Sequence, residues 1–210
     1  MTPTNGTVLV FLKSPKPGSV KTRLAATIGF GPAAELYRHW IGEVLKTLQP
    51  LRPGVRIVGA IDGRTEAFGA WESFVDAWWS QPVGDLGQRL DAGFRQAHEN
   101  TGPVVAVGTD CLELDTVLVD QAFLILRRRD VVFGPAVDGG YYLVGTARYL
   151  TDLFEHVRWS SCDTLTDHRR RCEERFWSYE LLPERHDIDT WEDWLAFIKR
   201  TGQRWTSFGS

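Results

Sequence analysis

The sequence predicts an α/β fold in which a mostly parallel central sheet is covered by helices on both faces. Short, continuous apolar runs such as residues 8–12 and 104–107 are typical of strands that are buried on both sides. Other segments carry apolar residues at helical spacing, as in residues 33–48, where Leu36 and Trp40 lie on one stripe. Strands that alternate with helices in this way indicate a three-layer structure.

The order of the expected elements follows from the same patterns. The expected strands are residues 8–12, 56–61, 76–80, 104–107, 131–133 and 141–144. The expected helices are residues 20–28 and 33–48, two more around residues 86–97 and 118–126, and a last helix that begins after Thr190. Thr190 and Asp193 have the spacing of a capping box, with Asp in place of the usual Glu. No repeat, low-complexity tract or linker divides the chain, so we expect a single domain over residues 1–210.

Composition argues against several classes of protein. Of the 210 residues, 43% are hydrophobic and 24% are charged, as in ordinary globular domains. The net charge of −3 argues against a general nucleic-acid-binding surface, which needs a basic stripe. No apolar segment reaches the length of a membrane span, and the N-terminus lacks the layout of a signal peptide. Cys111, Cys162 and Cys172 form no CxxC pair, so we expect a reduced, cytoplasmic protein without a disulfide framework.

The stretch KSPKPGSVKTRL places four cations in one turn, between the first expected strand and the first expected helix. In such sheets ligands bind outside the carboxyl ends of the strands, so a polyphosphate would meet amides, ammonium groups and a guanidinium here. A solvated basic turn accounts for the same composition, and the spacing is not that of a P-loop. The candidate nucleotide-binding residues of this turn are Lys13, Pro17, Gly18, Lys21 and Arg23.

Asp110 lies just past the buried strand at residues 104–107 and is a candidate metal ligand. Mg²⁺ prefers few protein oxygens and keeps waters and substrate phosphates as its other ligands. A carboxylate at this strand end would face the basic turn. A helix N-cap explains Asp110 equally well, because Asp is favoured there and a helix follows.

Two further segments carry carboxylates. The Asp-Gly-Gly segment at residues 138–140 separates two strands, and we favour a β-turn there. Its glycines would also let the backbone approach a ligand closely. In the segment HDIDT, Asp187 is a candidate second metal carboxylate, whereas we expect Asp189 or Thr190 to cap the last helix.

A Gly-rich loop, QPVGDLGQR, leads into the helix around residues 86–97. Gln81 or Gln88 could hydrogen-bond the edge of a nucleobase, while Asp85 is equally suited to cap the helix. Trp78 and Trp79 could stack on a base, although tryptophans mostly belong to the core.

Six motifs together resemble a known family. They are SPKPGSVKTRLA, GDLGQRL, VGTDCLEL, FGPAVDGGYYLVG, RWSS and DIDTWEDW, and they span about residues 8–195 in this order. The combination resembles the DUF2064 group of GT-A-fold proteins, which is often labelled glycosyltransferase-like and is similar to the 2-phospho-lactate guanylyltransferases. The resemblance implies a Rossmann-like, nucleotide-diphospho-sugar-transferase fold. Leu112 and Trp191 stand where the group usually has prolines, which affects turns rather than charged groups.

The resemblance also implies roles for individual residues. Lys21 and Arg23 match the cations of the family's nucleotide-phosphate loop. Asp110 matches the aspartate that holds the divalent metal, and Asp187 matches the first aspartate of a segment that joins the metal site. The residues implied at the nucleobase are Gly84, Asp85 and Gly87, and those implied at the acceptor are Asp138, Gly139 and Gly140.

The reaction we favour is nucleotidyl transfer, in which an acceptor phosphate or carboxylate attacks the α-phosphorus of a nucleoside triphosphate and pyrophosphate leaves. Such chemistry needs positioning and charge neutralisation more than covalent catalysis. Mg²⁺ or Mn²⁺ on Asp110 and Asp187 would hold the α-phosphate and the acceptor. Lys21 and Arg23 would stabilise the departing pyrophosphate.

Two alternatives stay open. Glycosyl transfer from a nucleotide sugar would use the metal to stabilise the departing nucleoside diphosphate and would need a base, for which Asp138 is the candidate. The lack of a DxD pair at Asp110 argues against it. A protein that binds nucleotides without turnover is the third hypothesis.

Overall fold

The computed structural model describes residues 6–52, 54–99 and 102–202. Within these residues, seven strands form one sheet in the order β3-β2-β1-β4-β6-β5-β7. The strands are β1 (Thr7–Lys13), β2 (Arg56–Asp62), β3 (Ala77–Ser80), β4 (Val104–Val107), β5 (Val131–Pro135), β6 (Tyr141–Thr146) and β7 (Tyr179–Leu181). Strand β6 is antiparallel to both neighbours, and every other neighbouring pair is parallel. The mostly parallel sheet predicted from the sequence is therefore confirmed.

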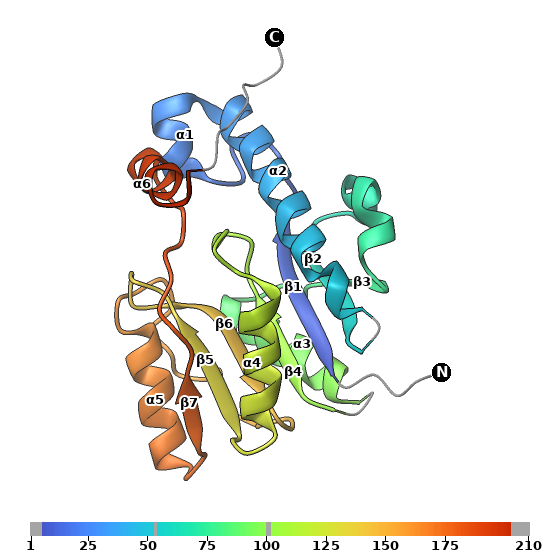
Figure 1. The fold of residues 1–210 in the computed structure, drawn as a ribbon, viewed down its shortest axis with the longest axis vertical. Coiled ribbons are helices and arrows are strands. Elements are labelled where there is room, and N and C mark those ends of the chain that lie inside the picture. Colours follow the sequence, from blue (N-terminus) through green and yellow to red (C-terminus); the bar gives the residue numbers. More distant parts are fainter. Residues whose placement is uncertain (1–5, 53, 100–101, 203–210) are drawn as a thin grey trace.

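Helices cover both faces of this sheet (Figure 1). The α-helices are α1 (Thr22–Ile28), α2 (Phe30–Leu48), α3 (Leu86–His98), α4 (Thr116–Leu126), α5 (Thr164–Glu174) and α6 (Trp191–Thr201). Two 3₁₀ segments, η1 (Gln49–Leu51) and η2 (Thr65–Phe74), flank β2. No helix in the described ranges is long and apolar enough to cross a membrane.

Side-chain alternation along β1 divides the core into two layers. Val8 and Val10 belong to a cluster that includes buried residues of α1, α2, α4 and α6. Leu9, between them, belongs to the opposite cluster with residues of α3 and α5. In Figure 1, α4 lies in front of the sheet and α3 behind it. Both faces of β1 are thus buried, as its continuous apolar run requires.

The structure differs from the predicted elements at several places, among them the start of α2, which is Phe30 and not residue 33. The first helix begins at Thr22 rather than at residue 20, because Lys21 has left-handed backbone dihedrals and acts as the N-cap. Helix α5 was not predicted, because its buried stripe consists of Thr164, His168 and Cys172 instead of aliphatic residues. Strand β7 was not predicted either, since it has only three residues.

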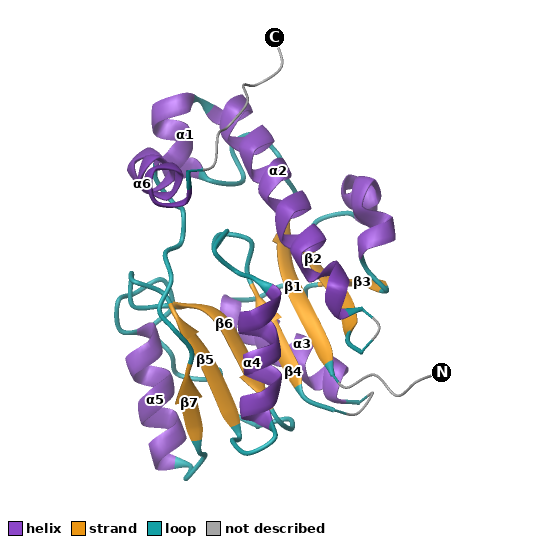
Figure 2. Cartoon of the chain, in the orientation of Figure 1, coloured by secondary structure: helices purple, strands orange, loops and turns teal. Residues whose placement is uncertain are grey.

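The strand directions decide which loops meet. Strands β1 and β4 pair in parallel, with Val10 opposite Val107, so their carboxyl ends lie on the same edge of the sheet. Because β6 is antiparallel to β4, the turn at residues 138–140 reaches that edge too. Figure 2 shows these loops between the sheet and the pair formed by α1 and α6. A hydrogen bond from the Ile188 amide to the Asp110 carbonyl oxygen, 2.9 Å long, joins the C-terminal segment to the loop after β4.

Candidate active site

A cavity of about 780 Å³ lies at the carboxyl ends of β1 and β4. The loop before α1, the loop after β4, the β5–β6 turn and the segment before α6 contribute to its walls. Lining residues that were candidates from the sequence are Lys13, Lys21, Arg23, Gln81, Gly84, Asp110, Asp138, Gly140 and Asp187. The structure therefore brings the basic turn and the candidate carboxylates to one site.

Lys21 is the most enclosed cation of this cavity, with only 5% of its side chain exposed. Its ammonium nitrogen lies 3.0 Å from Oδ1 of Asp110 and 3.1 Å from Oδ1 of Asp189. It also donates to the carbonyl oxygen of Ile188. Burial lowers the pKa of Lys21, but the charges of Asp110 and Asp189 outweigh it, and the net shift of the pKa is upward. Lys21 is therefore charged and neutralises the carboxylates on both sides.

Asp187 is the most perturbed carboxyl group of the site. Burial, followed by the charges of Asp110 and Asp138, raises the pKa of Asp187 to about 7. Its Oδ1 atom is buried and has no hydrogen-bond partner within the described residues. A buried carboxylate oxygen without a donor is costly unless a cation or a proton satisfies it.

The helix-cap explanation of Asp110 is wrong. The N-cap of α4 is Asp115, whose side chain accepts the amide hydrogen of Leu118 at 2.8 Å. Asp110 lies before that helix, and 43% of its side chain is exposed. The last helix is capped by Thr190, which forms the predicted capping box with Asp193. Asp189 therefore does not serve as the N-cap of this helix.

The carboxylates fit a divalent cation that takes few protein ligands. Asp110 and Asp187, whose Oδ1 has no hydrogen-bond partner within the described residues, supply carboxylate oxygens, the donor type that Mg²⁺ and Mn²⁺ prefer. No group of three or more His, Cys, Asp or Glu side chains in the described ranges is arranged to hold a metal alone. A bound ion would therefore need further ligands from water or a substrate.

Tyr37 of α2 supports the floor of the cavity. Its hydroxyl oxygen accepts from the Lys13 amide at 3.1 Å and from the Thr109 hydroxyl at 3.1 Å. Burial raises the pKa of Tyr37, so the phenol stays neutral. These bonds fix the end of β1 against the loop after β4, and sequence reasoning had treated Tyr37 only as part of a helix.

The other candidate nucleotide-binding residues of the basic turn are open to solvent. The Arg23 side chain is 76% exposed, and its Nη1 lies 3.8 Å from Oδ2 of Asp189. Lys13 lines the cavity and is exposed. Pro17 and Gly18 are exposed and do not line it; Gly18 has φ of 83°, which fits the turn that the sequence predicted. Contact of these residues with a nucleotide stays a prediction.

The Gly-rich loop at residues 81–89 supplies part of the cavity lining, and two of its residues have structural roles. Asp85 caps α3 with a capping box to Gln88. Gly87 is buried under the loop before α5, where a Cβ atom would lie 2.6 Å from the Phe154 carbonyl oxygen and 2.8 Å from Nε1 of Trp159. Neither residue lines the cavity, whereas Gly84 does.

Arg89 is a cavity residue that sequence reasoning missed. Its guanidinium donates to Oδ2 of Asp62 at 2.6 Å, to the Gly84 carbonyl oxygen at 2.9 Å and to Oε1 of Gln81 at 3.3 Å. Nε2 of Gln81 donates to the carbonyl oxygens of Leu12 and Ala60. Arg89 belongs to the motif GDLGQRL, which could have marked it as a candidate. The partner of Arg89, Asp62, lies 27 positions away in the sequence, so no local pattern connects the two residues.

The 138–140 segment forms the turn that we favoured. Oδ1 of Asp138 accepts the Gly140 amide hydrogen at 2.9 Å. Gly139 has φ of 89°, and its carbonyl oxygen accepts the Leu165 amide at the start of α5. Asp138 and Gly140 line the cavity together with Trp159, Ser160, Ser161 and Thr164, but Gly139 does not.

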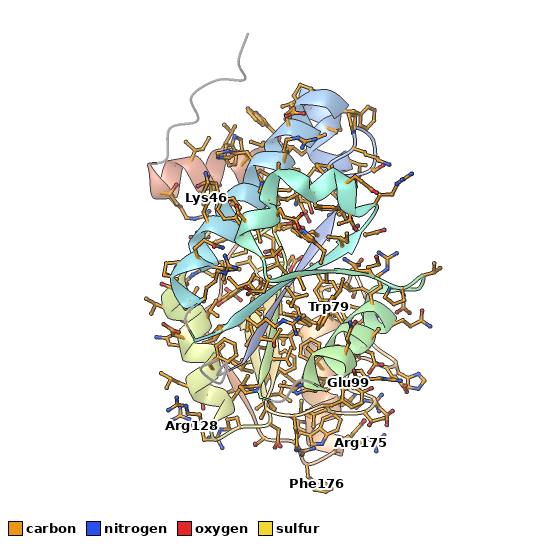
Figure 3. The ribbon with its side chains drawn as sticks, turned by 90° about the vertical axis from the view of Figure 1, so that its right-hand side faces the viewer. Lys46, Trp79, Glu99, Arg128, Arg175 and Phe176 are labelled. Atoms are coloured by element: carbon orange, nitrogen blue, oxygen red, sulfur yellow. The ribbon has the colours of Figure 1, made fainter. Side chains whose placement is uncertain are left out.

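The tryptophan pair lies outside the cavity lining. Trp78 packs on Phe68, with ring centroids 5.5 Å apart. The Arg56 guanidinium lies 5.4 Å from the ring centroid of Trp79, on edge strand β3 (Figure 3). Both therefore belong to the packing of the sheet.

Comparisons with known proteins identify the family of this chain. Residues 46–161, more than half of the chain, match the family described as "Uncharacterized protein conserved in bacteria (DUF2064)". The chain belongs to the DUF2064 family. No curated protein matches it. The resemblance inferred from the six motifs is thereby confirmed.

Solved structures confirm the GT-A-like fold of this DUF2064 protein. One, from Desulfovibrio desulfuricans G20 and provisionally described as a nucleotide-diphospho-sugar transferase, is 31% identical with a TM-score of 0.86, covering 97% of this chain and 90% of that one. A CMP:2-keto-3-deoxy-manno-octonic acid synthetase complexed with CTP is 11% identical with a TM-score of 0.59, covering 94% and 99%. Rv0371c from Mycobacterium tuberculosis H37Rv, in complex with manganese, is 13% identical with a TM-score of 0.55, covering 92% and 98%. The two distant structures share the fold of this chain.

Proposed function

We propose that this DUF2064 protein is a metal-dependent transferase that uses a nucleotide, and that it transfers a nucleotidyl group from a nucleoside triphosphate to a small acceptor. The observation that carries the proposal is the cavity itself, in which a basic turn faces Asp110, Asp187 and Asp189 at the carboxyl edge of the sheet. The CTP bound by one protein of the same fold and the manganese bound by another support it.

Asp110 and Asp187 would hold the metal ion, which when bound would neutralise phosphate charge and orient the phosphates. Arg23 is exposed and only loosely paired, so its guanidinium is free to bind a departing pyrophosphate. Arg89 and Gln81 would contact the nucleoside from the opposite wall. The loop before α5 would shield the acceptor from water.

Glycosyl transfer from a nucleotide sugar is the second candidate, because one observation favours it. The cavity wall formed by Asp138, Trp159, Ser160, Ser161 and Thr164 carries hydroxyl groups and a carboxylate but no lysine or arginine. Such a wall suits a hydroxyl acceptor better than a phosphorylated one. Asp138 would then serve as the base that takes the hydroxyl proton.

The released product separates the two reactions. Nucleotidyl transfer releases pyrophosphate from a triphosphate, whereas glycosyl transfer releases a nucleoside diphosphate from a nucleotide sugar. Both products should be measured with Mn²⁺ over the same set of phosphorylated, carboxylate and hydroxyl acceptors. Acceptor-dependent pyrophosphate supports the first proposal. Nucleoside diphosphate without pyrophosphate would replace it by the second, and Asp138→Asn would then abolish turnover.

A further inference from the structure

All three protons of the Lys21 ammonium are engaged. An ammonium group has three donors, and here they meet Asp110, Asp189 and the Ile188 carbonyl oxygen. In this arrangement no proton of Lys21 is left for a phosphate. Lys21 can therefore bind a nucleotide only by giving up at least one of these contacts.

The backbone at Lys21 also indicates that these contacts hold it in place. Lys21 has φ of 48° and ψ of 44°, in the left-handed region that a residue with a long side chain rarely adopts. It is the N-cap of α1, yet its side chain makes no capping hydrogen bond. The ion pairs across the cavity are interactions that can offset the cost of this conformation.

The same ammonium leaves the neighbouring carboxylates only partly satisfied. Asp187 Oδ1 is buried without a donor within the described residues, although Lys21 lies close enough for its charge to act on Asp187. Asp110 and Asp189 line the cavity, and 43% and 42% of their side chains are exposed. One ammonium group thus lies near three carboxyl groups, and the negative charge that it does not neutralise can attract a second cation.

We propose that Lys21 is an exchangeable counter-ion of this carboxylate cluster. In the metal-free protein its ammonium occupies the space between Asp110 and Asp189. Asp110 and Asp187 would hold a divalent ion, whose charge would repel the ammonium that contacts Asp110 at 3.0 Å, and the phosphates of a nucleotide would attract that ammonium. Metal and nucleotide would therefore each favour the binding of the other. The inference rests on the proposed function, because it assumes the metal and the nucleotide.

The direct test is the affinity for Mn²⁺ without nucleotide, measured at pH 8 from the spin-resonance signal of the free ion. Lys21→Met removes the competing cation, so we expect binding to be about ten-fold tighter or more than in the wild type. Lys16→Met is the matched control, since it removes one charge from the same loop at an exposed position; we expect a change of less than about two-fold. Unchanged or weaker Mn²⁺ binding by Lys21→Met would overturn the proposal.

A second variant and a second ligand keep the test decisive. Lys21→Gln is uncharged but retains a donor for the Ile188 carbonyl oxygen, so it serves if the Met variant does not fold. CTP and GTP should be titrated into the wild type with Mn²⁺. If Lys21→Met tightens Mn²⁺ binding but the wild type binds neither nucleotide, the counter-ion inference stands and the proposed function fails. If the wild type binds a nucleotide while Lys21→Met leaves Mn²⁺ affinity unchanged, the inference alone is wrong.

Discussion

At the scale of single residues, the cavity contains two ionisable side chains, Lys21 and Asp187, whose burial disfavours their charged forms. Lys21 stays ionised because two carboxylates contact it, whereas Asp187 has no such contact and its pKa rises to about 7. The folded protein therefore keeps a buried carboxyl group that would be more stable in water. Such groups are retained where a ligand uses them.

Asp187→Asn should stabilise the metal-free protein while removing a candidate metal ligand. The raised pKa means that the folded state of the wild type loses stability as pH rises from about 4 to about 7, because only the unfolded state is then readily ionised. Asn has no charge to bury, so its advantage in the free energy of unfolding should grow over that window and stay constant above it. Urea unfolding at a series of pH values measures this. An advantage that does not change with pH would contradict the assignment.

Arg23→Ala should weaken the binding of a nucleoside triphosphate more than that of the monophosphate. A lost charge-assisted hydrogen bond costs about 1.5–3 kcal/mol. Arg128→Ala is the control, because Arg128 pairs with Glu180 and lies far from α1, as Figure 3 shows. Calorimetry with both nucleotides measures the difference. Equal losses for the two ligands would indicate general electrostatics instead of phosphate contact.

At the scale of elements, the sequence patterns predicted strands and helices that local apolar runs define, and missed features that depend on contacts between separate segments. The strands β1 and β4 were predicted because their apolar runs are continuous. Helix α5 was missed because it buries Asp167 and His168, which a search for apolar residues passes over. Asp167 is held by Arg158, nine positions earlier, and His168 is enclosed by the rings of Tyr141 and Trp159. Likewise, the basic turn and the carboxylates were recognised one by one, but the pair Lys21–Asp189 spans 168 positions, so no spacing could predict it.

His168 makes α5 sensitive to acid. Its Nδ1–H donates to the Thr164 carbonyl oxygen, while Nε2 is buried without a partner within the described residues. Burial lowers the pKa of His168 to about 4. We therefore expect the contribution of His168 to the free energy of unfolding to be complete above about pH 6.5 and to fall as the pH drops toward 4, by roughly 3 kcal/mol in total.

Substitution isolates this effect. His168→Phe keeps an aromatic ring among Tyr141, Phe154 and Trp159 but cannot be protonated, so the loss of stability between pH 6.5 and 4 should shrink. His156→Gln, at an exposed position, should leave that loss unchanged. Thermal melting of the three proteins across this range provides the measurement. An equal acid loss in wild type and His168→Phe would show that another group is responsible.

At the scale of the whole molecule, the sheet topology assembles the site. The parallel strands bring the loops after β1 and β4 to one edge, and the antiparallel β6 adds the turn that carries Asp138. The C-terminal segment then crosses this edge and adds Asp187 and Asp189. Residues from both ends of the chain thus form one cavity, so the site depends on the complete fold.

The most direct test of this account is a calorimetric titration of CTP, GTP and ATP into the wild type and Asp110→Asn, each with Mn²⁺ and with a chelator. Asn has nearly the shape of Asp but lacks the charge that holds a metal. We expect the wild type to bind at least one triphosphate about ten-fold more tightly, or better, with Mn²⁺ than with the chelator, because Asp110 would supply a carboxylate ligand to the metal. Asp110→Asn should fold normally and lose this dependence. A variant that binds the same triphosphate with unchanged metal dependence would contradict the account.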